Sequence, residues 1–223
     1  MSFEFLEKAI FIRVPRTGST SIASLRNEVG FCVLGGARLG LWGRNVRLNT
    51  SSTLMERVEE LLIENGKECS FKFAFVRNPY ERAVSMWKHN SFKPQSFTSF
   101  CLKIYDHYIH NNQTLNLMQA WHTIPYYDIL FDEKGVKHVD FIGRYENMQA
   151  DFDKICERLG TKNIVVPKLN ASIKTFAKIS LSKLGHPPKG GHYSSHYSAE
   201  TKDIVGEIYH KDIKKFKYRF EKR

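Results

Sequence analysis

Two segments of this chain share one order of features: a short apolar run, a polar loop and a stretch with helical spacing. Residues 9–14 (AIFIRV) and 71–76 (FKFAFV) are rich in β-branched and aromatic side chains, which is typical of buried strands. Residues 19–26 and 81–89 follow them and are predicted to be helices, the second with Pro79 at its start. Because strands that alternate with helices form mainly parallel sheets, this order predicts an α/β fold that binds ligands at the carboxyl ends of its strands.

The remaining sequence supplies further elements but no internal repeat, and 223 residues fit a single domain spanning residues 1–223. A Thr-x-x-Glu capping box, a capping asparagine and helix-ending glycines mark several boundaries. The expected elements are, in chain order, a loop with one or two short strands over residues 30–52, a helix over 53–66, a helix over 97–108, a strand over 139–143, a helix that Asn147 caps and Gly160 ends, a loop over 168–198 and a closing helix over 199–216.

The chain is strongly basic, and this balance favours an anionic partner. It has 34 Lys and Arg residues against 23 Asp and Glu, a formal net charge of +11. Residues 211–223 alone carry seven basic side chains against two acidic ones. Such a run is usually a solvated face, although it could attract an anionic polysaccharide, a nucleic acid or an anionic membrane.

Several protein classes are excluded by what the sequence lacks. The four cysteines are far apart and show neither a Cys-x-x-Cys pair nor a zinc-ligand spacing, so we expect core thiols and no metal. The first residues lack a signal-peptide pattern, and no run of 18 apolar residues is present. We therefore expect a cytoplasmic protein without a membrane span.

The first polar loop, residues 15–21 (PRTGSTS), has the chemistry of a cradle for an anion. Gly18 permits close backbone approach, the start of the next helix offers unpaired N–H groups, and Arg16 adds a fixed charge. Further donors are the hydroxyl groups of Thr17, Ser19, Thr20 and Ser21. The Gly-x-x-x-x-Gly-Lys-Ser/Thr spacing of nucleoside triphosphatases is missing. A plain helix cap beside a turn fits the same residues equally well.

The second polar loop begins at Arg77, which ends the strand over residues 71–76. Ser85 lies eight residues later, in the following helix, so both side chains could converge on a second anion at the same edge of the sheet. Two anion sites on neighbouring strands suit a ligand with two charged ends. In the alternative interpretation Arg77 pairs with Glu81 and Ser85 faces solvent.

Both loops resemble motifs of one enzyme family, the sulfotransferases. Residues 11–21 (FIRVPRTGSTS) resemble the 5′-phosphosulfate-binding loop of this family, and residues 73–85 (FAFVRNPYERAVS) resemble its 3′-phosphate-binding motif. Residues 140–147 (DFIGRYEN), 167–170 (PKLN) and 209–218 are similar to the Golgi-type carbohydrate sulfotransferases and their bacterial and viral relatives. The resemblance spans most of the chain, in order.

The resemblance implies a P-loop NTPase-like three-layer α/β fold with a mainly parallel sheet flanked by helices. It also implies binding of 3′-phosphoadenosine 5′-phosphosulfate (PAPS) and in-line transfer of its sulfuryl group to an acceptor hydroxyl, without a metal. By position, residues 16–21 would hold the 5′-phosphosulfate, while Arg77 and Ser85 would hold the 3′-phosphate. The family usually has a lysine where this chain has Arg16. A guanidinium can stabilise charge on the leaving group but does not serve as a proton donor.

The transfer also needs a general base, and His122 is our candidate because residues 121–122 resemble a Trp-His segment of the family. His89, just after the second motif, is a second candidate, and at either position a structural histidine is the alternative. Relatives often place the base between the two motifs, but residues 31–70 contain no histidine. Lys189 and Gly190 resemble the start of the family's basic loop over the nucleotide, although a plain surface loop fits them as well.

Three functions therefore compete. The first is a PAPS-dependent sulfotransferase, with a carbohydrate as the first acceptor class and phenolic or tyrosyl hydroxyls as others. The second is a basic nucleic-acid-binding module, which no helix-turn-helix, zinc or RNA-recognition motif supports. The third is a degenerate relative that binds the nucleotide or a glycan without turnover. Two features would allow this: Arg16 stands where the family usually has lysine, and the segment between the two motifs has no histidine to act as the base.

Overall fold

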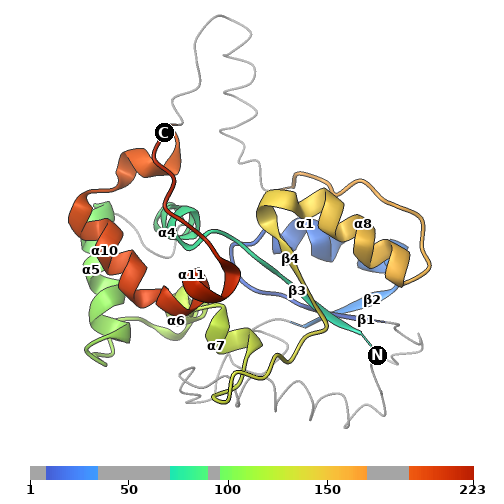
Figure 1. The fold of residues 1–223 in the computed structure, drawn as a ribbon, viewed down its shortest axis with the longest axis horizontal. Coiled ribbons are helices and arrows are strands. Elements are labelled where there is room, and N and C mark those ends of the chain that lie inside the picture. Colours follow the sequence, from blue (N-terminus) through green and yellow to red (C-terminus); the bar gives the residue numbers. More distant parts are fainter. Residues whose placement is uncertain (1–8, 35–70, 90–95, 170–190) are drawn as a thin grey trace, which may run out of the picture.

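A parallel sheet of four strands, in the order β2-β1-β3-β4, forms the centre of the protein (Figure 1). The computed structural model describes residues 9–34, 71–89, 96–169 and 191–223. The strands are β1 Ala9–Ile12, β2 Phe31–Leu34, β3 Lys72–Val76 and β4 Phe141–Arg144. After β1 the chain first adds β2 on one side and later β3 on the other. The carboxyl ends of β1 and β3 therefore flank a topological switch point, where ligands of open α/β sheets bind.

The helices surround this sheet and extend beyond it. Their bounds are α1 Ser19–Ser24, α2 Arg26–Val29, α4 Pro79–Trp87, α5 Phe97–Tyr108, α6 Leu117–Thr123, α7 Tyr127–Leu130, α8 Met148–Arg158, α10 Ala199–Ile208 and α11 His210–Phe216. Two 3-10 turns are η2 Tyr145–Asn147 and η3 Tyr193–His196.

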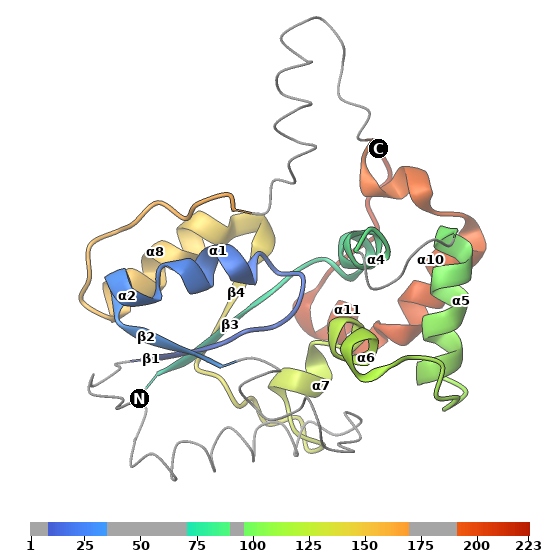
Figure 2. The same ribbon diagram turned by 180° about the vertical axis from the view of Figure 1, so that it is seen from behind.

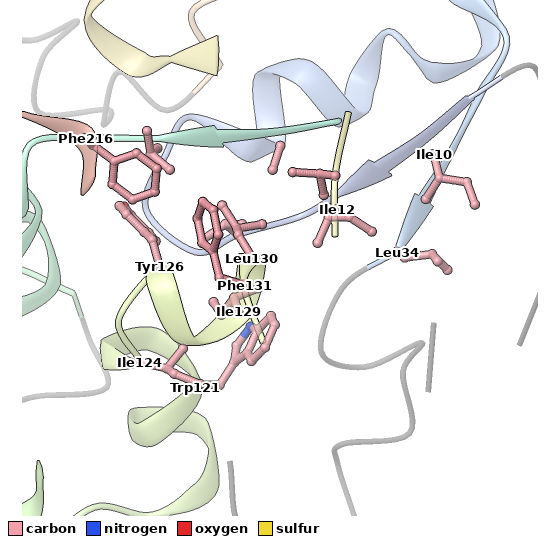
Figure 3. Close-up of a cluster of buried hydrophobic side chains, with 14 of the residues drawn as sticks. Ile10, Ile12, Leu34, Trp121, Ile124, Tyr126, Ile129, Leu130, Phe131 and Phe216 are labelled. Atoms are coloured by element: carbon pink, nitrogen blue, oxygen red, sulfur yellow. The ribbon is translucent and has the colours of Figure 1, made fainter. Parts of the chain in front are cut away.

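Both faces of the sheet are buried, which explains the uninterrupted apolar runs of its strands. One face presents Phe11, Phe73 and Phe75 to α1, α2 and α8. The other face presents Ile10 and Ile12 to the segment around α7 and to the end of α11. Figure 3 shows this second cluster, in which side chains of α7 and its flanks lie against β1. Helices on both faces give the three layers that were predicted.

A third apolar cluster joins α4, α5 and α10 beyond the carboxyl ends of the strands. In Figure 2 these helices and α6 lie together on the side to which β3 leads. The chain ends here as well: the carbonyl of Arg219 accepts a hydrogen bond from Asn78 Nδ2 at 2.9 Å, and Glu221 N donates to Tyr193 Oη at 2.7 Å. The last residues therefore pack against the start of α4, directly after the second polar loop.

The sequence predictions of an α/β fold and a parallel sheet are confirmed, with differences of detail in the bounds and caps of single elements. The closing helix is divided into α10 and α11 at Tyr209, which leaves helical geometry and whose buried hydroxyl donates to the carbonyl of Thr123 at 2.7 Å. Asn147 stands at the start of α8 but its side chain makes no capping bond. Helix α4 begins at Pro79, the residue predicted to stand at its start, and ends at Trp87 instead of His89. The helix predicted over residues 53–66 lies outside the described residues.

Candidate active site

The first polar loop leaves β1 and turns sharply before α1. Arg16 and Gly18 both have positive φ angles, 67° and 71°, and the hydroxyl of Thr17 donates to the carbonyl of Val14 at 2.9 Å. A Cβ atom on Gly18 would overlap Met148 Cε and press on the ring of Tyr145. The positive φ angle favours glycine at this position, whereas Met148 Cε is the end of a flexible side chain that can move aside.

The hydroxyl groups at the start of α1 are arranged as donors. Arg13 donates from Nε to Ser19 Oγ at 3.3 Å and from Nη2 to Thr20 Oγ1 at 3.0 Å. Because arginine only donates, each of these hydroxyls keeps its own hydrogen for an acceptor. The oxygen of Ser21 accepts a bond from the backbone N–H of Leu169 at 3.3 Å. The first N–H groups of a helix also lack acceptors within it.

The second polar loop directs Arg77 toward the first. Arg77 Nη1 donates to the carbonyl of Arg16 at 3.4 Å, and the guanidinium lies 4.1 Å from the ring centroid of Tyr145. Arg77 Nη2 also forms an ion pair with Glu81 at 2.6 Å, as the alternative interpretation of the sequence proposed. Asn78 caps α4 by accepting from the N–H of Tyr80 at 3.0 Å. The pairing with Glu81 and the approach to the first loop therefore coexist.

Arg16 joins the two loops directly. Its Nε and Nη2 donate to Ser85 Oγ at 3.2 and 2.8 Å, and Nη2 also donates to the carbonyl of Ser85 at 3.1 Å. These residues are 69 positions apart in the sequence. Ser85 consequently does not simply face solvent. The sequence predicted that it converges with Arg77 on a second anion, whereas its contacts in the structure are with Arg16 of the first loop.

The electrostatic environment of this junction is positive. Burial and then the nearby charge of Arg77 lower the pKa of Arg16, although a guanidinium stays charged at neutral pH. Burial also acts to lower the pKa of Arg77, but its hydrogen bond and ion pair with Glu81 outweigh this effect and the net shift is upward. Two clustered guanidinium groups, of which only Arg77 pairs with a carboxylate here, create a site suited to an anion.

Two histidines lie next to Arg16. The rings of His89 and His122 stack with centroids 4.9 Å apart, and His122 Nδ1 donates to the carbonyl of Met118 at 2.7 Å. Burial lowers the pKa of both histidines, and the charge of Arg16 lowers each further. Since a carbonyl oxygen only accepts, Nδ1 carries the ring proton and Nε2 is the nitrogen of neutral His122 that holds the basic lone pair.

A pocket of about 520 Å³ opens beside this junction, near the carboxyl ends of β3 and β4. Its lining is dominated by charged groups of both signs and includes Glu81, the partner of Arg77. Neither Arg16 nor Ser85 lines it. The lining residues are Asn78, Glu81, Arg144, Glu146, Asn147, Gly191, His192, Tyr193, Lys217, Tyr218, Arg219, Glu221 and Arg223. Lys189 and Gly190, which precede Gly191, lie outside the described residues.

Some residues of this site were not singled out from the sequence. Arg13 orients two hydroxyls of the first loop, and Tyr145 covers both Gly18 and the guanidinium of Arg77. Arg82 lies beneath the site and is completely buried. The sequence did contain a signal for Arg82: it is a charged residue on the apolar face of α4, which it shares with Pro79, Ala83 and Met86.

Other expectations concern groups outside this site. Cys101 and Cys156 are buried thiols, as expected of core cysteines, whereas Cys32 is only partly buried and Cys69 lies outside the described residues. Over the described ranges, no cluster of three or more His, Cys, Asp or Glu side chains is placed to hold a metal ion. The helices seen in those same ranges include none with the length and apolar character needed to cross a bilayer.

The sheet, the glycine-containing turn between β1 and α1 and the two converging loops define a P-loop-like α/β protein. A model of the sulfotransferase family matches residues 6–219, and the chain belongs to this family. The match confirms the resemblance that the two loops indicated, and the family as a class transfers sulfuryl groups. Comparisons with curated proteins and with solved structures give no significant match.

Proposed function

We propose that this protein transfers the sulfuryl group of PAPS to an acceptor hydroxyl, with a carbohydrate as the acceptor class. The observation that carries the proposal is the junction of the two loops, where Arg16, Arg77 and Ser85 meet at the switch point of the sheet. The carbohydrate acceptor rests on the similarity of residues 140–147 and 167–170 to the carbohydrate sulfotransferases.

The donors at this junction fit a ligand with two anionic ends. Arg77 Nε is buried and has no hydrogen-bond partner among the described residues. On the other side of the junction, Ser19 and Thr20 keep their hydroxyl hydrogens available. An unpartnered buried N–H costs free energy, and an oxygen of a phosphate group would remove this cost. Arg77 and Ser85 would hold the 3′-phosphate, and residues 16–21 the 5′-phosphosulfate.

PAPS, when bound, would supply the sulfuryl group and a nucleotide leaving group. Arg16 would stabilise the negative charge that grows on the oxygens around the leaving group, because it holds a permanent charge at the centre of the site. The first loop and α4 would position the two ends of the nucleotide, which lowers the entropic part of the barrier. The bond to Ser85 would then be exchanged for contacts with the nucleotide.

His122 would act as the general base that takes the proton of the acceptor hydroxyl. Its Nδ1 is bound to Met118, so Nε2 is the basic atom. A lowered pKa keeps this nitrogen unprotonated at neutral pH, and the stack on His89 limits rotation of the ring. A base of this kind contributes about 10²- to 10⁴-fold to a rate.

A pH profile tests this role. Because the base works only when neutral, kcat is expected to be constant from pH 8 down past about 6.5, the ordinary pKa of histidine, and then to fall about tenfold per pH unit. His122→Gln is expected to lower kcat about 10²-fold or more and to abolish the acidic limb. His89→Gln is the matched control and should keep the limb. An unchanged acidic limb in His122→Gln would exclude His122 as the base.

Nucleotide binding tests the site itself. Calorimetric titration with adenosine 3′,5′-bisphosphate is expected to show binding that adenosine 5′-monophosphate does not reproduce. Arg77→Ala is expected to weaken it about 10- to 100-fold, the effect of losing charge-assisted hydrogen bonds. Arg158→Ala, which removes an exposed arginine of α8, is the control and should leave the affinity unchanged.

The same titration separates the competing functions. A duplex oligonucleotide that binds in place of the bisphosphate, with affinity that falls steeply as salt increases, would favour a basic nucleic-acid-binding module. Bisphosphate binding without turnover on any carbohydrate or phenolic acceptor would favour the degenerate relative. Binding that requires the 3′-phosphate, together with transfer of sulfate from PAPS, is the result we expect.

A further inference from the structure

We propose that Arg82 is a positioning residue that holds His122 in the orientation needed to accept a proton, through the main chain at the end of α6. The inference rests on the proposed function, in which His122 is the base. Arg82 belongs to α4 and its exposed fraction is 0%. It therefore acts without contacting a ligand.

The contacts of Arg82 concentrate on one short segment. Its Nη2 donates to the carbonyl of His122 at 3.1 Å and to the carbonyl of Ile124 at 2.7 Å. The carbonyl between them, that of Thr123, accepts from the hydroxyl of Tyr209 at 2.7 Å. Three successive carbonyls at the end of α6 are thus held by buried donors.

Helix ends explain why this arrangement is effective. The last carbonyls of a helix have no intrahelical donor, and a positive charge near them interacts favourably with the helix dipole. Arg82 supplies both the donor and the charge at the end of α6. Since the ring of His122 is held by Met118 one turn earlier and its backbone by Arg82, the direction of Nε2 is defined from two sides.

The same side chain connects the base to both loops of the site. The guanidinium of Arg82 lies 3.9 Å from the ring centroid of Tyr126, whose hydroxyl donates to the carbonyl of Pro15 at 3.4 Å. Arg82 also lies three residues before Ser85 on the same helix. One rigid helix therefore sets the position of His122 relative to the proposed phosphate-binding groups.

Packing alone does not account for an arginine here. Its Nε and Nη1 have no hydrogen-bond partner within the described part of the chain, and burying a charge in this way is costly. An unbranched apolar side chain would fill the volume without that cost. Arg82→Met is consequently expected to remain folded while it loses the contacts to the end of α6.

Arg82→Met and Arg82→Lys test the proposal. We expect Arg82→Met to lower kcat at least about tenfold, because a displacement of about 1 Å in a reacting group can cost 10²-fold. Its affinity for adenosine 3′,5′-bisphosphate should stay within about twofold of the wild type. Arg82→Lys keeps the charge and one donor, so its kcat should lie between the two. Ile155→Ala, a buried change in α8 far from this segment, controls for loss of stability alone.

A second readout does not depend on turnover. In the free protein, nuclear magnetic resonance of the His122 ring nitrogens should show the ring proton on Nδ1 in the wild type, and a mixture of Nδ1- and Nε2-protonated rings in Arg82→Met, because the end of α6 is no longer held. The charged groups that act on this ring are Arg13 directly after β1, Arg16 of the first loop and Arg82 of α4, and the titratable ring of His89 stacks on it.

The outcomes separate this proposal from the proposed function. If Arg82→Met leaves both kcat and the position of the His122 ring proton unchanged, or weakens nucleotide binding in parallel with kcat, the positioning role is overturned. If the His122 resonances respond to Arg82→Met as expected while the wild type transfers no sulfate, the positioning contact stands and the proposed function fails.

Discussion

Arg16→Ala is expected to lower kcat for sulfuryl transfer by about 10²- to 10³-fold, whereas Arg16→Lys should keep most of the rate. Alanine removes a fixed charge from the centre of the junction, next to Arg77 and Ser85. Lysine restores the charge and matches the residue that relatives carry, but it cannot reproduce the forked contact with Ser85. The measurement is kcat and KM with PAPS and the best acceptor from a screen of carbohydrates and phenols.

Two further variants make this result specific. Arg158→Ala also removes one positive charge, but from the exposed end of α8, and should leave kcat unchanged. Ser85→Ala removes the partner of Arg16 and should weaken binding of adenosine 3′,5′-bisphosphate more than it lowers kcat. Equal rates for the wild type, Arg16→Lys and Arg16→Ala would show that Arg16 does not stabilise the leaving group.

Asp212→Ala is expected to destabilise the fold by about 2–6 kcal/mol, because it leaves two buried N–H groups without an acceptor and each such group costs about 1–3 kcal/mol. The carboxylate of Asp212 is fully buried and accepts the backbone N–H groups of Tyr126 and Tyr127 at 2.9 and 2.6 Å. Alanine would leave both N–H groups without an acceptor and would remove a negative charge near buried Arg82. Urea unfolding measures the difference.

Asp128→Ala provides the comparison for this prediction. Asp128 lies at the same contact of α7 with α11, but its side chain is 29% exposed and pairs loosely with Lys211 at 3.7 Å. An exposed pair of this kind contributes about 0–1 kcal/mol. A loss of stability in Asp212→Ala no larger than that in Asp128→Ala would contradict the proposed importance of the buried carboxylate.

The pH dependence of stability has a definite sign at Asp212. Burial raises its pKa from 3.8 to about 6, against the opposing charge of Arg82, so the folded state holds this proton more tightly than the unfolded chain does. The contribution of Asp212 to the free energy of unfolding therefore falls as the pH rises from about 4 to about 6 and is constant above that range. Asp212→Asn removes this titration, and the difference in Tm between the two proteins from pH 4 to 7 measures it.

Much of the fold was predictable because its signals are local. The apolar runs that became β1 and β3 are buried on both faces, which produces unbroken apolar sequence rather than alternation. The division of the closing helix was not predictable. The apolar spacing continues across Tyr209. The helix nevertheless ends there, and the Tyr209 hydroxyl bonds to the carbonyl of Thr123, which is distant in the sequence.

The candidate site was predictable in composition and less so in its contacts. Residues 15–21 and Arg77 were identified from the order of glycine, hydroxyl and basic residues in each loop. The direct bonds from Arg16 to Ser85 could not be foreseen, because two loops on one sheet edge are brought together only by the pairing of β1 with β3. The same holds for the stack of His89 on His122.

The amino-acid sequence by itself determined the strands, the turn at Gly18, the chemistry of the two loops and the membership of the sulfotransferase family. These properties depend on residues that are neighbours in the chain. The tertiary structure alone decided which donors meet, since the contacts of Arg82 with His122 and of Arg16 with Ser85 join residues 40 and 69 positions apart. Burial in the folded core also created the charge environment that lowers the pKa of His122 and raises that of Asp212.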